Sequence, residues 1–133
     1  LEEGRFPEIE INRDDITISD KSPSKDLLSN FPNKPIRIGT INKGGQGERI
    51  YHIDGVGITL SAHGGGPGKK TGAYLVNNKI RRLTTRESAR MMGFPEDFKI
   101  SSSNAQAYTQ FGNAVVVNVV QFIIKDILDK KII

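Results

Sequence analysis

Apolar and polar residues alternate along the middle of the chain and repeat with a helical period toward the carboxy terminus. Between residues 36 and 76, the short apolar stretches IRIGTI, RIYHI, DGVGITL and TGAYLV are separated by glycine-rich segments. A period of two is typical of strands with one buried face. We therefore predict a series of short strands here, followed by a turn at NNK (77–79) and another strand over 80–83.

The segment before these strands has a weaker pattern. EIEINRDDITISD alternates Ile9, Ile11, Ile16 and Ile18 with polar residues, which predicts one or two short strands. Three prolines then interrupt KSPSKDLLSNFPNKP. We expect residues 1–35 to be a connecting segment that packs on neighbouring structure.

After residue 83 the period changes to about 3.6, which is typical of helices. Thr84 and Glu87 fit a capping box, and Gly93 fits a helix stop, so we predict a short helix over 85–92. Ser103 and Gln106 repeat the capping pattern ahead of AYTQF.

Asn113 can cap the start of the last predicted helix. Its apolar positions form one stripe and need a partner surface, because so many β-branched residues make a poor isolated helix. The stripe comprises Val115, Val116, Val119, Val120, Ile123, Ile124, Ile127 and Leu128.

These elements predict an α+β fold. We expect a small twisted, mainly antiparallel sheet with long glycine-rich loops, followed by short helices and a carboxy-terminal helix. The predicted divisions are residues 1–35, the strand and loop region 36–83, and the helical region 84–133.

Positive charge is concentrated in the middle of the chain. Residues 34–86 hold ten basic and two acidic residues, a net charge of +8, whereas residues 1–33 hold four basic and eight acidic ones. Such a block suits a surface that faces a polyanion such as DNA. A solvated basic face that binds nothing fits the charge equally well.

The composition excludes several kinds of site. With no cysteine, the chain has no disulfide, no thiolate metal site and no cysteine nucleophile. Two histidines are too few for a zinc site, so we expect no metal. We also expect no membrane span and no secretory leader, and hence the cytoplasm. Because the chain begins with Leu1, we expect it to be a fragment.

Two blocks carry a family resemblance. RRLTTRESARMMGFP (81–95) and QAYTQFGNAVVVNVV (106–120) resemble the last two conserved motifs of bacterial DNA (cytosine-5) methyltransferases. The stretch from NKGGQGER to KIRRL (42–83) resembles the target-recognition region of HhaI-type enzymes, so that the likeness extends over about residues 36–128.

The resemblance implies one part of a larger enzyme. In that family a large domain holds S-adenosylmethionine and the catalytic groups, and a small domain reads double-stranded DNA. This chain lacks the Pro-Cys nucleophile, the Glu-Asn-Val segment and the F-x-G-x-G loop. Cytosine carbon 5 becomes nucleophilic only after a thiolate adds at carbon 6, so the chain alone should be inactive.

The resemblance implies that two loops read the bases of a DNA site from which one cytosine is flipped out. Gln46 would fill the space left by the flipped cytosine, and Arg49 would contact guanine. The alternatives are a plain hairpin tip for Gln46 and a salt bridge to Glu48 or Asp54 for Arg49. A second loop would read base edges through its backbone, with a flexible linker as the alternative; it comprises His63, Gly64, Gly65 and Gly66.

Other residues are implied to position DNA or cofactor. The DNA phosphate candidates, which could also be outward strand residues or solvated charges, are Lys43, Thr59, Ser61, Lys69 and Lys70. Asn113, Ala114 and Val115 match a segment that closes the cofactor site, and the apolar stripe after them would pack on the large domain.

The implied function is the DNA-reading part of a bacterial restriction-modification methyltransferase. The implied target is a short G+C-containing palindrome similar to GCGC, although family members of the HhaI type have tyrosine where His63 stands. A non-enzymatic DNA-binding module and the small subunit of a split methyltransferase are the alternatives.

Overall fold

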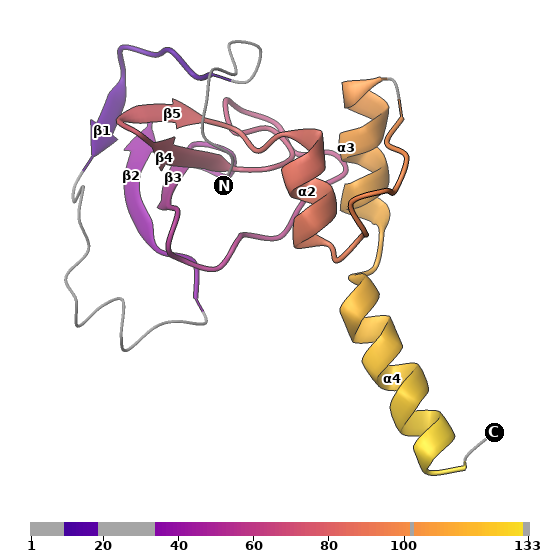
Figure 1. Ribbon diagram of the computed structural model, residues 1–133. Coiled ribbons are helices and arrows are strands. Elements are labelled where there is room, and N and C mark those ends of the chain that lie inside the picture. The colour runs from indigo at the N-terminus through magenta and orange to yellow at the C-terminus, as the bar shows by residue number, and fades with distance from the viewer. Residues whose placement is uncertain (1–9, 19–33, 102, 132–133) are drawn as a thin grey trace.

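The computed structural model describes residues 10–18, 34–101 and 103–131 (Figure 1). One sheet contains five strands, which lie in sequence order. They are β1 (Ile16–Ile18), β2 (Arg37–Ile41), β3 (Arg49–His52), β4 (Ala73–Val76) and β5 (Lys79–Arg81). The helices that follow are α2 (Thr85–Met91), α3 (Asn104–Asn113) and α4 (Val117–Asp129).

Three of the four strand pairs are antiparallel, which confirms the prediction of a mainly antiparallel sheet. The exception is β3 with β4, which run parallel with Tyr51 opposite Tyr74. Parallel neighbours need a long crossover connection, because a tight hairpin can only reverse the chain. Residues 53–72 supply that crossover as an irregular, glycine-rich segment. This topology places a long loop beside the end of the sheet.

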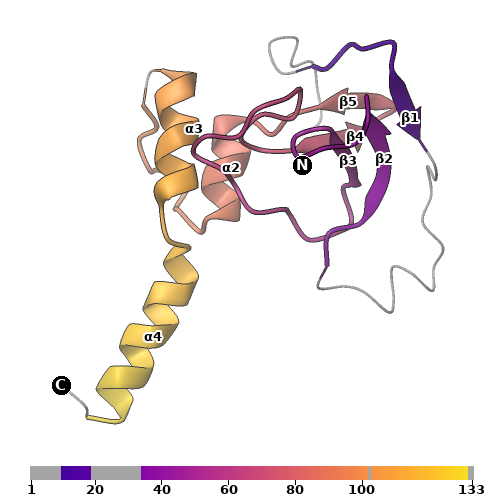
Figure 2. The ribbon, with the colours of Figure 1, turned by 180° about the vertical axis from the view of Figure 1, so that it is seen from behind.

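Two apolar clusters form the core. One packs against the sheet and contains mostly isoleucines, namely Ile36, Ile38, Ile41, Ile50 and Ile80, together with Ala73. The other joins the crossover segment to α2 and α3, and includes Leu60, Tyr74, Leu83, Ala89, Ala107 and Phe111. In Figures 1 and 2 these two helices accordingly lie beside one end of the sheet.

The predicted strand in DGVGITL does not form, so that prediction is wrong. Residues 56–61 have no regular secondary structure, and they are held by individual contacts in place of a ladder. The backbone N–H of Ile58 donates to the hydroxyl of Tyr74 over 3.2 Å, and Ser61 N–H donates to the Lys70 carbonyl over 2.9 Å. Burial of Leu60 anchors the segment.

Strand formation near the amino terminus is only partly described. β1 pairs with β2, and Ile11 N–H donates to the carbonyl of Ile80 over 2.7 Å at the opposite edge of the sheet. The described part of residues 1–35 thus packs on the core through Ile11, Ile16 and Ile18. The expected pairing of Ile9, and the proline-rich segment, lie outside the described residues.

The helix starts follow the predicted caps. Thr84 and Glu87 form a complete capping box for α2, and Gly93 follows that helix with a φ of 81°. The Ser103 side chain caps α3 by accepting from Gln106 N–H.

The cap predicted for the last helix is wrong. Asn113 is the last residue of α3, and the residue before α4 is Val116, which makes no side-chain capping bond. Instead, Val117 N–H donates to the Met92 carbonyl over 2.9 Å. A contact with the end of α2 therefore replaces a local cap, and a contact between distant segments cannot be read from neighbouring residues.

The carboxy-terminal helix projects away from the rest of the protein (Figures 1 and 2). None of the residues of α4 is buried, and Val115, Val119, Ile123 and Leu128 of the apolar stripe are each more than half exposed. Most of the apolar stripe is therefore exposed, as expected of a stripe that needs a partner surface.

This region also bears on the membrane prediction. By length and composition alone, Asn104–Asp129 is apolar enough to cross a membrane, with a hydropathy of 1.5. The prediction that the chain holds no such segment was therefore too strong. Residues 114–116 interrupt the segment between α3 and α4, with Ala114 in an extended conformation. Extended backbone leaves polar groups without helical partners, which is costly in lipid.

Candidate nucleic-acid interface

Two glycine-rich loops lie in direct backbone contact. The first loop (residues 42–48) joins β2 to β3, and the second loop (residues 63–70) belongs to the crossover. Gly68 N–H donates to the Gly47 carbonyl over 2.8 Å. A Cβ atom on Gly47 would lie only 2.1 Å from the carbonyl oxygen of Gly65. Glycine is therefore needed here for close approach, and the two loops predicted to enter DNA form one surface.

The tip of the first loop is held by a carboxylate. Glu48 accepts hydrogen bonds from the Asn42 side-chain amide over 3.1 Å and from Gly45 N–H over 2.9 Å. These bonds, with Asn42 as the larger cause, lower the pKa of Glu48. Gln46 lies between Gly45 and Glu48 in the sequence, at the exposed tip of the loop. Hydrogen bonds within the loop thus fix its conformation, and the side-chain amide of Gln46 is left exposed at the surface.

Arg49 stands exposed at the start of β3, directly after the first loop. Its Nε donates to the Gly44 carbonyl over 3.3 Å. Neither Glu48 nor Asp54 forms an ion pair with it among the described residues, since Glu48 bonds within the loop and Asp54 lies 3.7 Å from His52 Nδ1. The predicted alternative of a salt bridge is therefore wrong.

A pocket of about 340 Å³ opens beside the two loops, and we call it the loop pocket. It brings together most of the predicted DNA-contacting residues, and no carboxylate is among its lining residues. They are Gln46, Gly47, Arg49, Tyr51, Ile58, Thr59, Ser61, Gly64, Lys69, Lys70 and Gly72. The exposed residues His63, Gly65 and Gly66 belong to the second loop but do not line this pocket.

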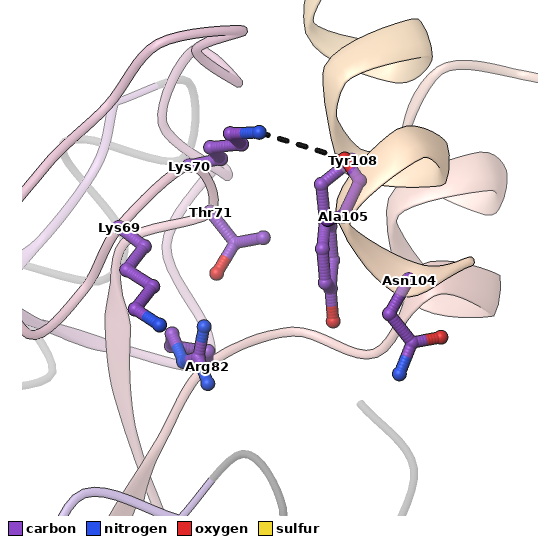
Figure 3. Close-up of a pocket in the computed structure, with 7 residues that line it drawn as sticks. All are labelled: Lys69, Lys70, Thr71, Arg82, Asn104, Ala105 and Tyr108. Atoms are coloured by element: carbon purple, nitrogen blue, oxygen red, sulfur yellow. Dashed lines mark hydrogen bonds between the residues drawn. The ribbon is translucent and has the colours of Figure 1, made fainter.

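The three predicted phosphate-binding lysines differ in their surroundings. Lys43 and Lys69 are exposed, on the first and second loops respectively. Lys70 is turned toward α3, where its Nζ donates to the Ala105 carbonyl over 3.5 Å (Figure 3). The same Nζ donates to Thr109 Oγ1 over 2.5 Å. Lys70 therefore fastens the second loop to the helix, whatever else it binds.

The three residues expected to close the cofactor site lie at and after the end of α3. Ala114 packs against the core, whereas Val115 is 64% exposed and Asn113 is exposed. The neighbouring pocket is largely apolar, and its lining residues include no carboxylate. Of the three residues, Ala114 is the one that lines this pocket.

Sequence reasoning missed two tyrosines, one that lines the loop pocket and one buried next to it. Tyr51 lines it, and its ring lies 6.0 Å from that of Tyr74. The hydroxyl of Tyr74 accepts a hydrogen bond from the Ile58 N–H. Burial raises the pKa of the Tyr74 phenol, although the hydrogen bond from Ile58 opposes this shift. Both stand in the predicted strands RIYHI and TGAYLV, but their contact depends on the parallel register of β3 and β4.

Comparison with known proteins identifies the family. Residues 6–129 match the family of C-5 cytosine-specific DNA methylases. The chain belongs to this family. It is 46% identical over 123 residues to the type II methyltransferase M.HhaI of Haemophilus parahaemolyticus, an alignment that covers 92% of this chain. It is 40% identical over 79 residues to the type II methyltransferase M.BanI of Aneurinibacillus aneurinilyticus, which covers 59% of this chain.

The chain corresponds to a minor part of these relatives. The matched region is 36% of M.HhaI and 18% of M.BanI. Among solved structures, the Dnmt2 methyltransferase of S. pombe superposes with a TM-score of 0.52 and 20% identity, over 94% of this chain and 41% of that one. At this identity the similarity shows the fold alone, and the fold agrees with the α+β prediction.

Proposed function

We propose that this chain is the DNA-recognition and carboxy-terminal portion of an S-adenosylmethionine-dependent DNA (cytosine-5) methyltransferase of a bacterial restriction-modification system. The observation that carries the proposal is the contact between the two glycine-rich loops. It places exposed Gln46 and Arg49 beside a pocket whose lining includes no carboxylate. Such a surface can approach a polyanion closely.

In this proposal the loops stabilise a flipped-out cytosine. Extruding a base costs a few kcal/mol, which contacts to the opened duplex must offset. The Gln46 amide can both donate to and accept from the orphaned guanine. Arg49 can make a bidentate contact to a guanine, worth about 1–3 kcal/mol of discrimination. The backbone of Gly64, Gly65 and Gly66, with His63 beside it, would read neighbouring base edges in a short palindrome.

The remaining polar residues of this surface would position the duplex without reading its sequence. Hydroxyls and ammonium groups bind backbone phosphates, which fixes the register of a protein on DNA. Thr59 and Ser61 lie with Lys69 in the loop pocket, and Lys43 extends from the first loop. These contacts would hold the protein in place while the bases are read.

A large domain must supply the chemistry. The chain has no cysteine to serve as the nucleophile, and S-adenosylmethionine, bound on the large domain, would provide the methyl group. The exposed apolar stripe of α4 supports a missing partner, because an apolar patch of this kind marks an interaction surface. Residues 113–115 would then close the cofactor site from the side of this chain. The partner could belong to the same polypeptide or be the second subunit of a split enzyme in the bacterial cytoplasm.

Complementation tests the enzymatic part of the proposal. We expect the chain mixed with a cysteine-containing large domain of a related methyltransferase to transfer the labelled methyl group of S-adenosylmethionine to DNA. The chain alone and the large domain alone should each be inactive. If DNA binds but no related large domain restores transfer, the chain is a non-enzymatic binding module.

Recognition is tested by Gln46→Ala and Arg49→Ala. Each should weaken binding to the cognate site by about 1–3 kcal/mol, as expected for a lost base contact, and affect random DNA much less. Arg37→Ala is the matched control, since Arg37 is exposed at the end of β2 farther from the first loop. Fluorescence anisotropy with cognate and scrambled duplexes measures both affinities. Equal losses on the two duplexes would show that these residues touch only phosphates.

A further inference from the structure

A chain of hydrogen bonds runs from the residues before β1 to the tip of the first loop, and Asn42 is its middle member. In the register of β1 on β2, Ile16 pairs with Ile41. The next residues outward, Asp15 and Asn42, are therefore neighbours, and Asn42 N–H donates to the Asp15 carbonyl over 3.1 Å. The first loop thus leaves the sheet from a point that is tied to β1.

The side chain of Asn42 uses both of its polar atoms. Its carbonyl oxygen accepts from Arg13 Nη2 over 3.4 Å, and its amide nitrogen donates to Glu48 Oε1 over 3.1 Å. Arg13 is held in turn by Asp15, whose carboxylate accepts from Arg13 Nε over 3.3 Å. An amide can join a guanidinium to a carboxylate because it accepts on one side and donates on the other. Neither a carboxylate nor an ammonium group can do both.

Glu48 carries this connection to the tip of the loop. Its other oxygen, Oε2, accepts from Gly45 N–H over 2.9 Å, directly before Gln46 in the sequence. Three of the seven residues in the loop (42–48) are glycines, the residues that restrict the backbone least. Hydrogen bonds must therefore supply the order that side chains do not.

The backbone at Asn42 is in the left-handed region, with a φ of 54°. Asparagine adopts this conformation more readily than most residues, and glycine adopts it without penalty. Asn42→Gly therefore removes the amide and keeps the path of the chain.

We propose that Asn42 is a positioning residue for base recognition, which acts through Glu48 to hold the Gln46 amide in the place from which it enters the duplex. The inference rests on the proposed function, in which Gln46 takes the place of the flipped cytosine. It adds a residue that touches no base and takes its own position from the segment before β1. A loop that is ordered before DNA arrives loses less entropy on binding, so more of its contact energy appears as affinity.

Asn42→Gly tests the proposal on the duplex that the native chain selects from a randomised pool. We expect preference for this duplex over a scrambled one to fall by about tenfold, within the range of one lost base contact. The fall should not exceed that of Gln46→Ala, because Asn42 acts only through Gln46. The hydrogen bonds removed are exposed, so the unfolding midpoint should change little.

Asn78→Gly is the matched control. Asn78 is also an exposed asparagine with a left-handed backbone, with a φ of 64°, but it lies in the β4–β5 turn. Its replacement should leave the preference unchanged. Equal losses in the two variants would overturn the proposal, since they would not depend on the contact with Glu48.

A combined variant separates positioning from a general structural role. In the Gln46→Ala background, Asn42→Gly should cause no further loss of preference, because no amide is left to position. A further tenfold loss there would show that Asn42 acts elsewhere, and would overturn the proposal.

Exchange of the two interacting groups provides a rescue. Asn42→Asp alone sets two carboxylates against each other and should lower the preference. Adding Glu48→Gln restores a donor opposite the new carboxylate, and its amide oxygen can still accept from Gly45 N–H. The double variant has the net charge of the native chain, so recovered preference reports the hydrogen bond itself. Failure to recover would contradict the proposal.

The side-chain carboxyl resonance of Glu48 reports the same bond in the absence of DNA. The hydrogen bond from Asn42 is the largest cause that lowers the pKa of Glu48, and the bond from Gly45 N–H is the next. We expect this pKa to rise in Asn42→Gly and to stay unchanged in Asn78→Gly. An unchanged pKa in Asn42→Gly would mean that Asn42 does not hold Glu48 in solution, and would overturn the proposal.

The two proposals can fail separately. If the native chain selects no duplex, or if Gln46→Ala keeps the native preference, the recognition proposal fails and the role of Asn42 fails with it. If Gln46→Ala loses the preference and Asn42→Gly keeps it, only the role of Asn42 is overturned.

Discussion

Glu87→Ala should lower the free energy of unfolding by about 3–5 kcal/mol, the usual effect of removing one partner of a buried ion pair. The Arg81 and Glu87 side chains are only 5% and 4% exposed, and their charged groups meet at 2.8 Å. Glu87 also accepts a hydrogen bond from Thr84 N–H over 2.8 Å, which completes the capping box of α2. The substitution would leave a buried guanidinium without its carboxylate and take half of the cap away.

Glu96→Ala is the matched control for this loss. Glu96 pairs with Arg90 over 2.6 Å, but their side chains are 65% and 44% exposed. Solvent screens such a pair, so its removal should change stability by less than about 1 kcal/mol. Urea denaturation followed by circular dichroism measures both variants. Equal losses would mean that burial does not distinguish the two ion pairs.

Gly47→Ala should separate the two loops and abolish preference for the cognate site. Gly47 has a φ of 80°, and a Cβ atom there would lie 2.1 Å from the Gly65 carbonyl oxygen. The left-handed conformation costs an alanine about 1–2 kcal/mol, and overpacking adds about 1–3 kcal/mol. Because the obstacle is backbone, it can be relieved only by moving a loop. Anisotropy with cognate and scrambled duplexes should show cognate affinity falling to the level of the scrambled one.

Gly65→Ala controls for the effect of an added methyl group on stability; because Gly65 is itself proposed to face the bases, it is not a control for DNA binding. A Cβ atom at Gly65 meets nothing within 4 Å, so the unfolding midpoint should not change. If Gly47→Ala kept its preference for the cognate site, contact between the loops would be irrelevant to recognition. Loss of binding in Gly65→Ala without loss of stability would instead point to a direct DNA contact at that residue.

Local patterns predicted those elements whose causes lie within a few residues. The alternation in IRIGTI and RIYHI corresponds to β2 and β3, and the Thr84–Glu87 spacing corresponds to the observed capping box. The alternation in DGVGITL was equally regular, yet no strand formed there; Ile58 N–H donates to the Tyr74 hydroxyl, and the Ser61 N–H that follows the segment donates to the Lys70 carbonyl. The predicted boundaries of the three chain segments, and the roles of individual site residues, remain predictions.

By itself the sequence determined the types of residue at the site and the motifs that indicate the family, since both are properties of short segments. Only the tertiary structure decided that Gly47 meets the second loop, that Lys70 turns to α3, and that Lys69 and Arg82 line one pocket. These contacts join segments far apart in the chain. Their geometry depends on the parallel register of β3 and β4 and on the packing of α3 against the crossover, and no local propensity encodes either of these.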